Sequence, residues 1–310
     1  MIEPLLLTTA RLATYDGDQQ RSGATGFFFE RDGRLYIVTS RHVAIDEPSG
    51  HRPSRITVEL HDDPANLAHA LNWSVPLYDD KGVPLWRQGQ DAGGEVDVAV
   101  IRLDREAMPA TVLLQAFTPE HLQDSFDEVE VGSSLLVVGF PLGFHDTLHH
   151  LPVVRQAVIA SSFGLRFQGQ GYFLSDARTH RGISGAPVVL RMQGEAAEGA
   201  ALPWRLLGVH SARLDMSGRD LQADETLGLN CTWYADILLT LTTDPAPLAP
   251  ATPPELVPAA PAAAPAPAPA PAAAAVPAPA LTPVPAGPAA PASPVAVPAE
   301  PCQMASPSTP

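Results

Sequence analysis

Cysteine is nearly absent from this sequence, which contains only Cys231 and Cys302 among its 310 residues. A small secreted scaffold held together by disulfides needs several cysteine pairs, so that class of protein is excluded. Cys302 lies in a segment that has no means of forming a core, and we therefore expect both thiols to be free. Free thiols fit a reducing compartment.

Long apolar runs are missing as well. No segment reaches the roughly 18 apolar residues that a membrane-spanning helix needs. The first residues, 1–7, lack the basic stretch and the long apolar core of a secretion signal. We therefore expect a cytoplasmic protein with no membrane partner.

Positive charge is scarce: 19 lysine and arginine residues stand against 34 aspartate and glutamate residues, a formal net charge of −15. Nucleic acids and anionic membrane surfaces repel an acidic protein. The charge therefore argues against nucleic acid as a partner, although it says little about the fold.

Aromatic residues and nearly all charges disappear from the last part of the chain, 244–310, which consists mainly of proline and alanine. Such a segment cannot bury enough apolar surface to offset the loss of chain entropy. We expect a disordered tail with polyproline character, whose partner is unknown. The preceding 243 residues are enough for one large domain or two small ones.

Helical periodicity is weak before the tail, and the best helical candidate is a short closing segment at 234–241. Short runs rich in Val, Ile, Leu and Phe, bounded by Gly, Pro, Asp and Asn, predict strands instead. These predicted strands cover residues 5–14, 23–29, 34–39, 55–60, 97–103, 134–139, 153–160, 186–191 and 205–211. Many short strands with irregular loops indicate an all-β barrel or sandwich fold.

Ser184 lies in the segment Gly182-Ile183-Ser184-Gly185, which is followed by an apolar run. A nucleophilic serine needs an exposed hydroxyl with backbone N–H groups turned toward the oxyanion that forms beside it. The two glycines permit the unusual backbone angles that this arrangement requires. The alternative is an ordinary tight turn.

His42 follows an apolar run, 35–38, directly after a short polar turn. An imidazole with an ordinary pKa of about 6.5 suits a general base working near neutrality. The sequence has ten histidines, so only the position of His42 separates it from a structural histidine.

Asp97 opens an apolar run, 97–103, that we expect to be buried on both faces. A carboxylate entering such a strand needs a partner, since burial without one is costly. The imidazole N–H of His42 would supply that partner. The alternative is a turn aspartate that follows Gly93 and Gly94.

Taken together, the order His42, Asp97, Ser184, with spacings of 55 and 87 residues, resembles the chymotrypsin-like serine peptidases. The resemblance covers roughly residues 20–240. Its local matches are 24–27, 38–43, 97–100, a Gly-x-Pro-x-Gly turn within 138–143, and 175–187. The last segment, Ser-Asp-Ala-x-x-x-x-Gly-x-Ser-Gly-x-Pro, is similar to the bacterial Deg/HtrA-type peptidases.

This resemblance implies two six-stranded antiparallel barrels, at 1–115 and 116–243, with His42 and Asp97 in the first and Ser184 in the second. Ser184 would attack the scissile carbonyl, His42 would take its proton, and Asp97 would orient the imidazole. The N–H groups of Gly182 and Ser184 would form the oxyanion hole. No metal or organic cofactor is implied, and the substrate is a protein or peptide.

Two departures from the family pattern limit which properties of the family can be expected of this chain. Ile183 stands where digestive relatives have an aspartate, so the usual zymogen switch is missing. No regulatory PDZ module is found, and the Pro/Ala tail takes its place. The alternative reading is a catalytically inactive, protease-like binding module tethered by the tail.

Substrate preference is predicted from the same resemblance. Thr179 and His210 match the positions where glutamyl endopeptidases have a threonine and a histidine that bind the substrate's carboxylate, and Arg178 adds a cation beside them. These residues predict cleavage after an acidic residue, with a buried structural role for His210 as the alternative.

A cluster of histidines at 145, 149 and 150 is conceivable as a zinc site. A solvated loop is the favoured interpretation of this segment, so no metal is expected.

Overall fold

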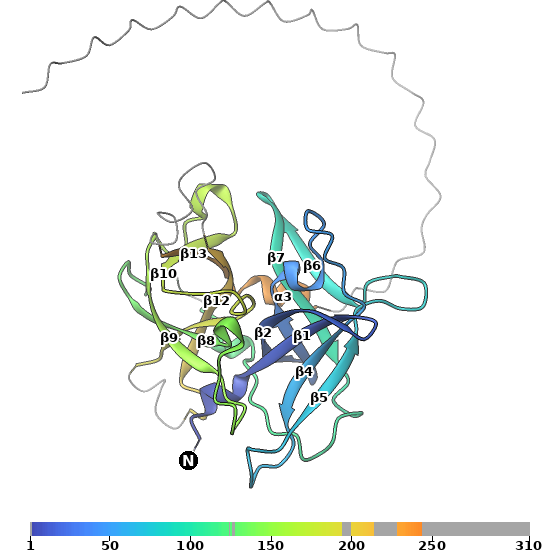
Figure 1. The fold of residues 1–310 in the computed structure, drawn as a ribbon. Coiled ribbons are helices and arrows are strands. Elements are labelled where there is room, and N and C mark those ends of the chain that lie inside the picture. Colours follow the sequence, from blue (N-terminus) through green and yellow to red (C-terminus); the bar gives the residue numbers. More distant parts are fainter. Residues whose placement is uncertain (1, 124, 126–127, 194–199, 214–227, 244–310) are drawn as a thin grey trace, which may run out of the picture. The chain divides into compact units, whose positions relative to one another are not determined.

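The computed structural model describes residues 2–123, 125, 128–193, 200–213 and 228–243 (Figure 1). The chain divides into two units, Met1–Ala249 and Pro250–Pro310, and every described residue belongs to the first. The tail predicted to be disordered, with Cys302, lies outside the described residues. Cys231 is a free thiol, as predicted. No helix in the described part of the chain is long and apolar enough to cross a membrane.

Strands dominate both halves of the first unit. The first half contains β1 (Thr9–Asp16), β2 (Gln19–Arg31), β3 (Arg34–Thr39), β4 (Arg55–His61), β5 (Ala70–Pro76), β6 (Trp86–Asp91) and β7 (Gly94–Leu103). The second contains β8 (Ser134–Gly139), β9 (Val153–Ile159), β10 (Tyr172–Asp176), β11 (Pro187–Arg191), β12 (Trp204–Arg213) and β13 (Leu229–Tyr234). Helices are short: η1 (Pro4–Thr8), α1 (Arg41–Ala44), η2 (Pro119–His121), η3 (Pro141–Gly143), η4 (Phe167–Gly169) and α3 (Ile237–Leu241).

The all-β class is confirmed, and the second half forms a closed barrel of six strands in the order β10-β13-β12-β11-β8-β9. The first half differs in detail from the six-stranded barrel that the resemblance implied. It is a seven-stranded sheet in the order β5-β4-β1-β2-β3-β7-β6. Its two edge strands, β5 and β6, pair with β4 and β7. Figure 1 shows the strands of the sheet and those of the barrel in two lobes.

All strands of the sheet come from residues 9–103 and all strands of the barrel from 134–234. The boundary placed between residues 115 and 116 stays a prediction. Every predicted strand overlaps an observed one, and the predicted closing helix is reduced to α3 because Tyr234 ends β13.

One apolar cluster joins the two halves. It contains Phe27 and Val100 from the sheet together with Leu206 and Trp233 from the barrel, all of them less than one tenth exposed. Burying apolar surface is the main favourable contribution to folding. The sheet and the barrel therefore stabilise each other, and residues contributed by the two halves can be held in fixed positions between them.

Candidate active site

His42 and Asp97 are joined by two hydrogen bonds. The backbone N–H of His42 donates to Oδ1 of Asp97 at 2.9 Å, and Nδ1 of its ring lies 2.8 Å from Oδ2 of the same carboxylate. Because the carboxylate only accepts, Nδ1 carries the proton and Nε2 keeps its lone pair. The pair predicted from the sequence is therefore formed, with the basic nitrogen of His42 free to accept a proton.

The local fold explains why these residues meet. Strand β3 ends beside Ala99 of β7, and α1 begins two residues later, so the chain turns His42 toward Asp97. On the other edge of β7, Gln88 pairs with Ala99 while Gly89 pairs with Val96, which leaves Asp97 in a β-bulge. Bulges redirect side chains and are frequent beside active sites.

Ser211 on β12 also contacts this carboxylate: its hydroxyl donates to Oδ2 of Asp97. Ser211 lies at another irregularity in strand register, between His210 and Arg213. Asp97 thus receives three donors from two residues, one on each half of the molecule. Three hydrogen bonds fix the orientation of the carboxylate.

The pKa of His42 reflects two opposing effects. Burial lowers it, but the hydrogen bond to Asp97 and the negative charges of Asp97 and Asp46 together raise it by more, so the pKa lies above the ordinary value of 6.5. The positive charge that His42 would gain as a general base is therefore stabilised.

Ser184 lies in the connection between β10 and β11, with a glycine in the left-handed region on either side of the Ile183–Ser184 pair. Gly182 has φ +90° and Gly185 has φ +86°. A β-carbon on Gly182 would lie 2.7 Å from the carbonyl oxygen of Phe140, so only glycine fits. The glycines singled out in the sequence are thus required both by backbone angle and by space.

We call the segment 177–186, which joins β10 to β11 and contains Ser184, the serine connection. Thr25 of β2, in the other half of the molecule, is hydrogen-bonded to it. Its backbone N–H donates to the carbonyl oxygen of Ser184 at 3.0 Å, and its hydroxyl donates to the carbonyl oxygen of Gly182 at 2.8 Å. The hydroxyl of Thr25 also accepts the N–H of Phe140 at 3.1 Å. Thr25 is fully buried, so these bonds are shielded from competition with water.

The backbone N–H groups of Gly182 and Ser184 have no acceptor among the described residues. By contrast, the flanking N–H of Gly185 donates to the carbonyl oxygen of His210 at 2.8 Å. Two unpaired donors beside a serine hydroxyl provide what an oxyanion requires.

His42, Ser184 and Gly182 line one cavity of about 260 Å³, bounded on the sheet side by 22–24 and on the barrel side by Arg181. No hydrogen bond between the Ser184 hydroxyl and the His42 ring is found within the described part of the chain. In an enzyme without substrate such bonds are often long and tighten only in the complex.

The three residues predicted to select the substrate lie outside this cavity. Thr179 and His210 are buried, 3% and 2% exposed, and Arg178 is at the surface. None of them lines the cavity shared by His42 and Ser184. The Thr179 hydroxyl donates to Oδ1 of Asn230 at 2.5 Å, so its hydrogen is already used.

His210 is the cross-strand partner of Thr232, whose hydroxyl contacts that of Ser175 at 3.1 Å. We call Ser175, Thr179, His210, Asn230 and Thr232 the buried polar cluster. Within it, Nδ1 of His210 has no hydrogen-bond partner among the described residues. Burial, and then the nearby charge of His42, lower the pKa of His210 to about 4 despite the opposing influence of Asp97. His210 is therefore neutral at pH 7.

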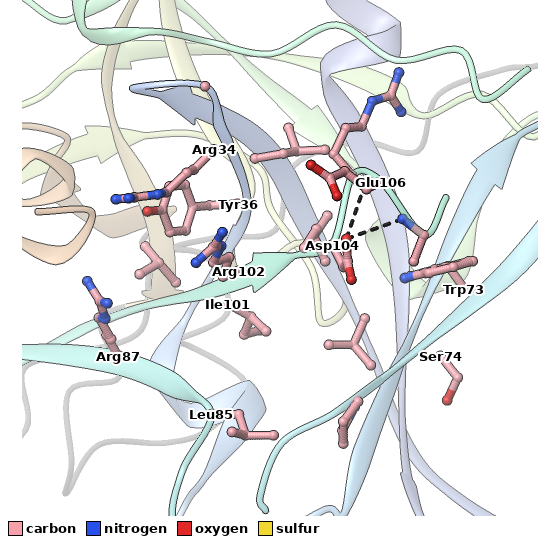
Figure 2. A pocket seen from close by; sticks show the side chains of 18 residues that line it. Arg34, Tyr36, Trp73, Ser74, Leu85, Arg87, Ile101, Arg102, Asp104 and Glu106 are labelled. Atoms are coloured by element: carbon pink, nitrogen blue, oxygen red, sulfur yellow. Dashed lines mark hydrogen bonds between the residues drawn. The ribbon is translucent and has the colours of Figure 1, made fainter. Parts of the chain in front are cut away.

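A larger cavity, of about 850 Å³, lies on the sheet half and contains none of these residues. Figure 2 shows Arg34, Tyr36 and Arg102 on one side of it and Asp104 on the other. Oδ1 of Asp104 accepts the backbone N–H groups of Glu106 and Ala107, at 3.1 and 3.2 Å. Its lining contains neither histidine nor cysteine, and its carboxylates are those of Asp104 and Glu106.

Two residues of the site were given no role by the sequence. Thr25 belongs to a segment that matched the family, but its contact with the serine connection spans more than 150 positions of the chain. Ser211 follows His210 in the strand that the resemblance assigned to the substrate pocket, and its hydrogen bond to Asp97 was not predicted. Both depend on contacts between the two halves, which a single sequence does not reveal.

Comparisons with known proteins identify the family of the chain. The family described as trypsin-like peptidase domain matches residues 24–196, more than half of the chain. Among solved structures, an HtrA-type protease, AlgW, with a tripeptide is 19% identical, with a TM-score of 0.45 over 76% of this chain and 58% of that one. A serine endoprotease from Yersinia pestis is 15% identical, with a TM-score of 0.45 over 76% of this chain and 62% of that one. The chain thus spans about three fifths of the length of these proteins, and by its matching residues it belongs to the trypsin-like peptidase domain family.

Proposed function

We propose that the protein is a serine endopeptidase in which Ser184 is the nucleophile, His42 the general base and Asp97 the residue that orients His42. The observation that carries this proposal is the cavity shared by Ser184 and His42, with the His42 ring fixed by Asp97. A protein or peptide chain is the substrate.

The chemistry follows from the donors and acceptors at the site. Nε2 of His42 accepts the proton of the Ser184 hydroxyl as the serine oxygen attacks the scissile carbonyl carbon. The carbonyl oxygen becomes an oxyanion, which the N–H groups of Gly182 and Ser184 stabilise. His42 then gives its proton to the leaving amine, and water, activated by the same histidine, releases the acyl group from Ser184.

Replacing Ser184 by alanine tests the proposal. The hydroxyl makes no hydrogen bond to the rest of the described protein, so Ser184→Ala should leave the fold intact and reduce kcat on the order of 10⁶-fold. The measurement is peptidase turnover together with covalent labelling by a fluorophosphonate probe. Labelling of the native protein, lost in Ser184→Ala, supports an enzyme; a native protein that is folded and never labelled supports the inactive binding module.

We further propose that the enzyme prefers an acidic residue before the cleaved bond. Support comes from two groups of the barrel that have no partner among the described residues, Nδ1 of His210 and the exposed guanidinium of Arg178. Because the Thr179 hydroxyl already donates to Asn230, its part would be to position Asn230 in the buried polar cluster.

Cleavage of a peptide library measures this preference. We expect Glu or Asp before the cut, with the preference reduced in both Arg178→Ala and His210→Ala. Selection of small aliphatic or basic residues would reject the acidic preference and leave the proposed peptidase activity untouched.

A further inference from the structure

The loop between β8 and β9 brings two histidines to the sheet half of the molecule. His145 and His150 belong to this loop, and Glu59 projects from β4. One ligand atom from each of the three residues lies within 4.8 Å of the others. The sequence suggested only a local cluster of His145, His149 and His150. In the structure the group contains the Glu59 carboxylate, 86 positions before His145, and does not contain His149.

The spacing of these atoms fits a zinc ion. Zinc bonds to imidazole nitrogen and carboxylate oxygen are about 2.0–2.2 Å long and tetrahedral, which places two ligand atoms about 3.3 Å apart. Nδ1 of His150 is 3.2 Å from Oε1 of Glu59. These two atoms already stand at the separation that a common zinc ion imposes, and a modest rotation of the His145 side chain would complete the set.

One ring nitrogen of His145 is already held by a hydrogen bond. Its Nδ1 is 2.6 Å from the carbonyl oxygen of Gly143, so Nδ1 carries the proton and Nε2 presents its lone pair. Metal-binding histidines usually donate their second nitrogen to a carbonyl or carboxylate in this way.

Glu59 is also held in place. Its side chain is only 11% exposed, and Arg11 holds both carboxylate oxygens: Nε donates to Oε2 at 3.0 Å and Nη2 donates to Oε1 at 3.4 Å. Oε1 also lies 3.2 Å from Nδ1 of His150. On the same strand, Nε2 of His61 lies 2.7 Å from the carbonyl oxygen of His149 and ties the loop to β4. The carboxylate therefore comes with an orienting partner, as ligating carboxylates do.

His149 provides an internal contrast. Its Nδ1 pairs with Oδ2 of Asp146 at 2.7 Å, and it is not one of the three grouped residues. Two adjacent histidines in one loop thus have different surroundings, and only one of them faces Glu59.

From this arrangement we propose that Glu59, His145 and His150 form a zinc site with water as a fourth ligand, which links the β8–β9 loop of the barrel to β4 of the sheet. Two imidazoles and one carboxylate favour zinc over calcium or magnesium, which prefer oxygen ligands. On binding, the proton on Nδ1 of His150 moves to Nε2, and Nδ1 bonds to the ion in place of its hydrogen bond to Glu59.

Zinc titration of the full-length protein, freed of metal by a chelator, tests the site. Zinc competes with a chromogenic indicator, and Co²⁺ replaces it for visible absorption spectroscopy. We expect one ion per chain, a rise in melting temperature with zinc, and d–d bands of a four-coordinate site without thiolate absorption. Binding should weaken roughly tenfold or more in His150→Gln and in His145→Gln, and remain unchanged in the matched control His149→Gln.

Glu59→Gln should weaken binding to a similar degree, and its melting temperature without zinc shows whether loss of the Arg11 ion pair disturbs the fold. Equal affinity in the native protein and in both His145→Gln and His150→Gln overturns the site. The same holds if His149→Gln loses as much affinity, or if the cobalt spectrum shows thiolate ligation. None of these readouts requires peptidase activity, so this site and the proposed catalysis can fail separately.

Discussion

His42 and His210 influence each other's charge, yet their surroundings shift their pKa values in opposite directions. Burial lowers both, but only His42 has a carboxylate hydrogen-bonded to its ring, so its pKa ends above 6.5 while that of His210 falls to about 4. Pairs of titratable groups that are driven apart in this way mark the division of roles in an active site. Of the two, His42 is the group whose pKa stays above the ordinary histidine value.

The pH dependence of kcat/KM follows from this difference. The general base works only when neutral, so the rate should fall as pH decreases through the His42 pKa, with a midpoint above 6.5 because Asp97 raises that pKa. Asp97→Asn should shift the midpoint to lower pH and reduce kcat on the order of 10⁴-fold. The measurement is initial rate against pH on a short peptide.

A midpoint near 4 in the native protein would instead assign the titration to His210. A midpoint that stays in place in Asp97→Asn would show that Asp97 does not set the pKa of His42.

The three residues of the proposed triad could be named from the sequence because each lies in a local segment with its own chemical signature, such as the glycines around Ser184. Ser211 could not, since an isolated serine in an apolar strand has no signature until its contact with Asp97 is seen. Glu59 is a similar case: its two histidine neighbours come from the other half of the molecule.

The serine connection is shaped by lack of space at Gly185. A β-carbon there would lie 2.3 Å from both the carbonyl oxygen of Thr25 and the hydroxyl of Thr39, and the residue has φ +86°. Gly185→Ala should therefore lower the free energy of unfolding by roughly 3 kcal/mol or more, the sum of a left-handed backbone penalty and overpacking. Urea denaturation gives this value.

Gly17→Ala is the matched control for backbone angle alone. Gly17 has φ +56°, and a β-carbon added to it would meet no atom within 4 Å, so its replacement should cost only about 1–2 kcal/mol. Equal losses in the two variants would contradict the claim that close packing shapes the serine connection.

Four of the described strands were not predicted: β5 and β6, the two edges of the sheet, and β10 and β13 in the barrel. Strand β8 matches its predicted bounds, 134–139, because four of its six residues are buried. Strand β6 was missed because Trp86 is its only buried residue and the rest of it is polar. Its structure depends on hydrogen bonds to β7, the next strand along the chain, and not on an apolar pattern of its own. Strand β10, although buried, is only five residues long.

The composition of the tail leads to a prediction about the whole chain. Deleting 250–310 should change the melting temperature by no more than about 2 °C and leave turnover of small peptides unaltered, because a Pro/Ala segment has little apolar surface to bury. Thermal unfolding and a peptide assay measure both effects.

A longer deletion, 237–310, provides the contrast. It removes α3, whose Leu238 and Leu241 are 0% and 4% exposed and belong to the apolar cluster that joins the halves. We expect a large fall in melting temperature, since each buried leucine contributes about 1.5–3 kcal/mol. A comparable fall on deleting 250–310 would show that the tail stabilises the folded unit.

Location in the cytoplasm stays a prediction, as does the partner of the tail. Both rest on sequence composition alone, whereas the family, the all-β class and the pairing of His42 with Asp97 now rest on structure and comparison.

The two hydrogen bonds from Thr25 to the serine connection have a practical consequence. Since the loop of Ser184 is held in part by the opposite half, a barrel expressed alone would lack part of the scaffold of the proposed oxyanion donors. Two fragments of the gene, each encoding one half and each silent by itself, would recover cleavage only on reassembly. The molecule is thus suited to serve as a split reporter, in which proteolysis signals that two fused proteins have met.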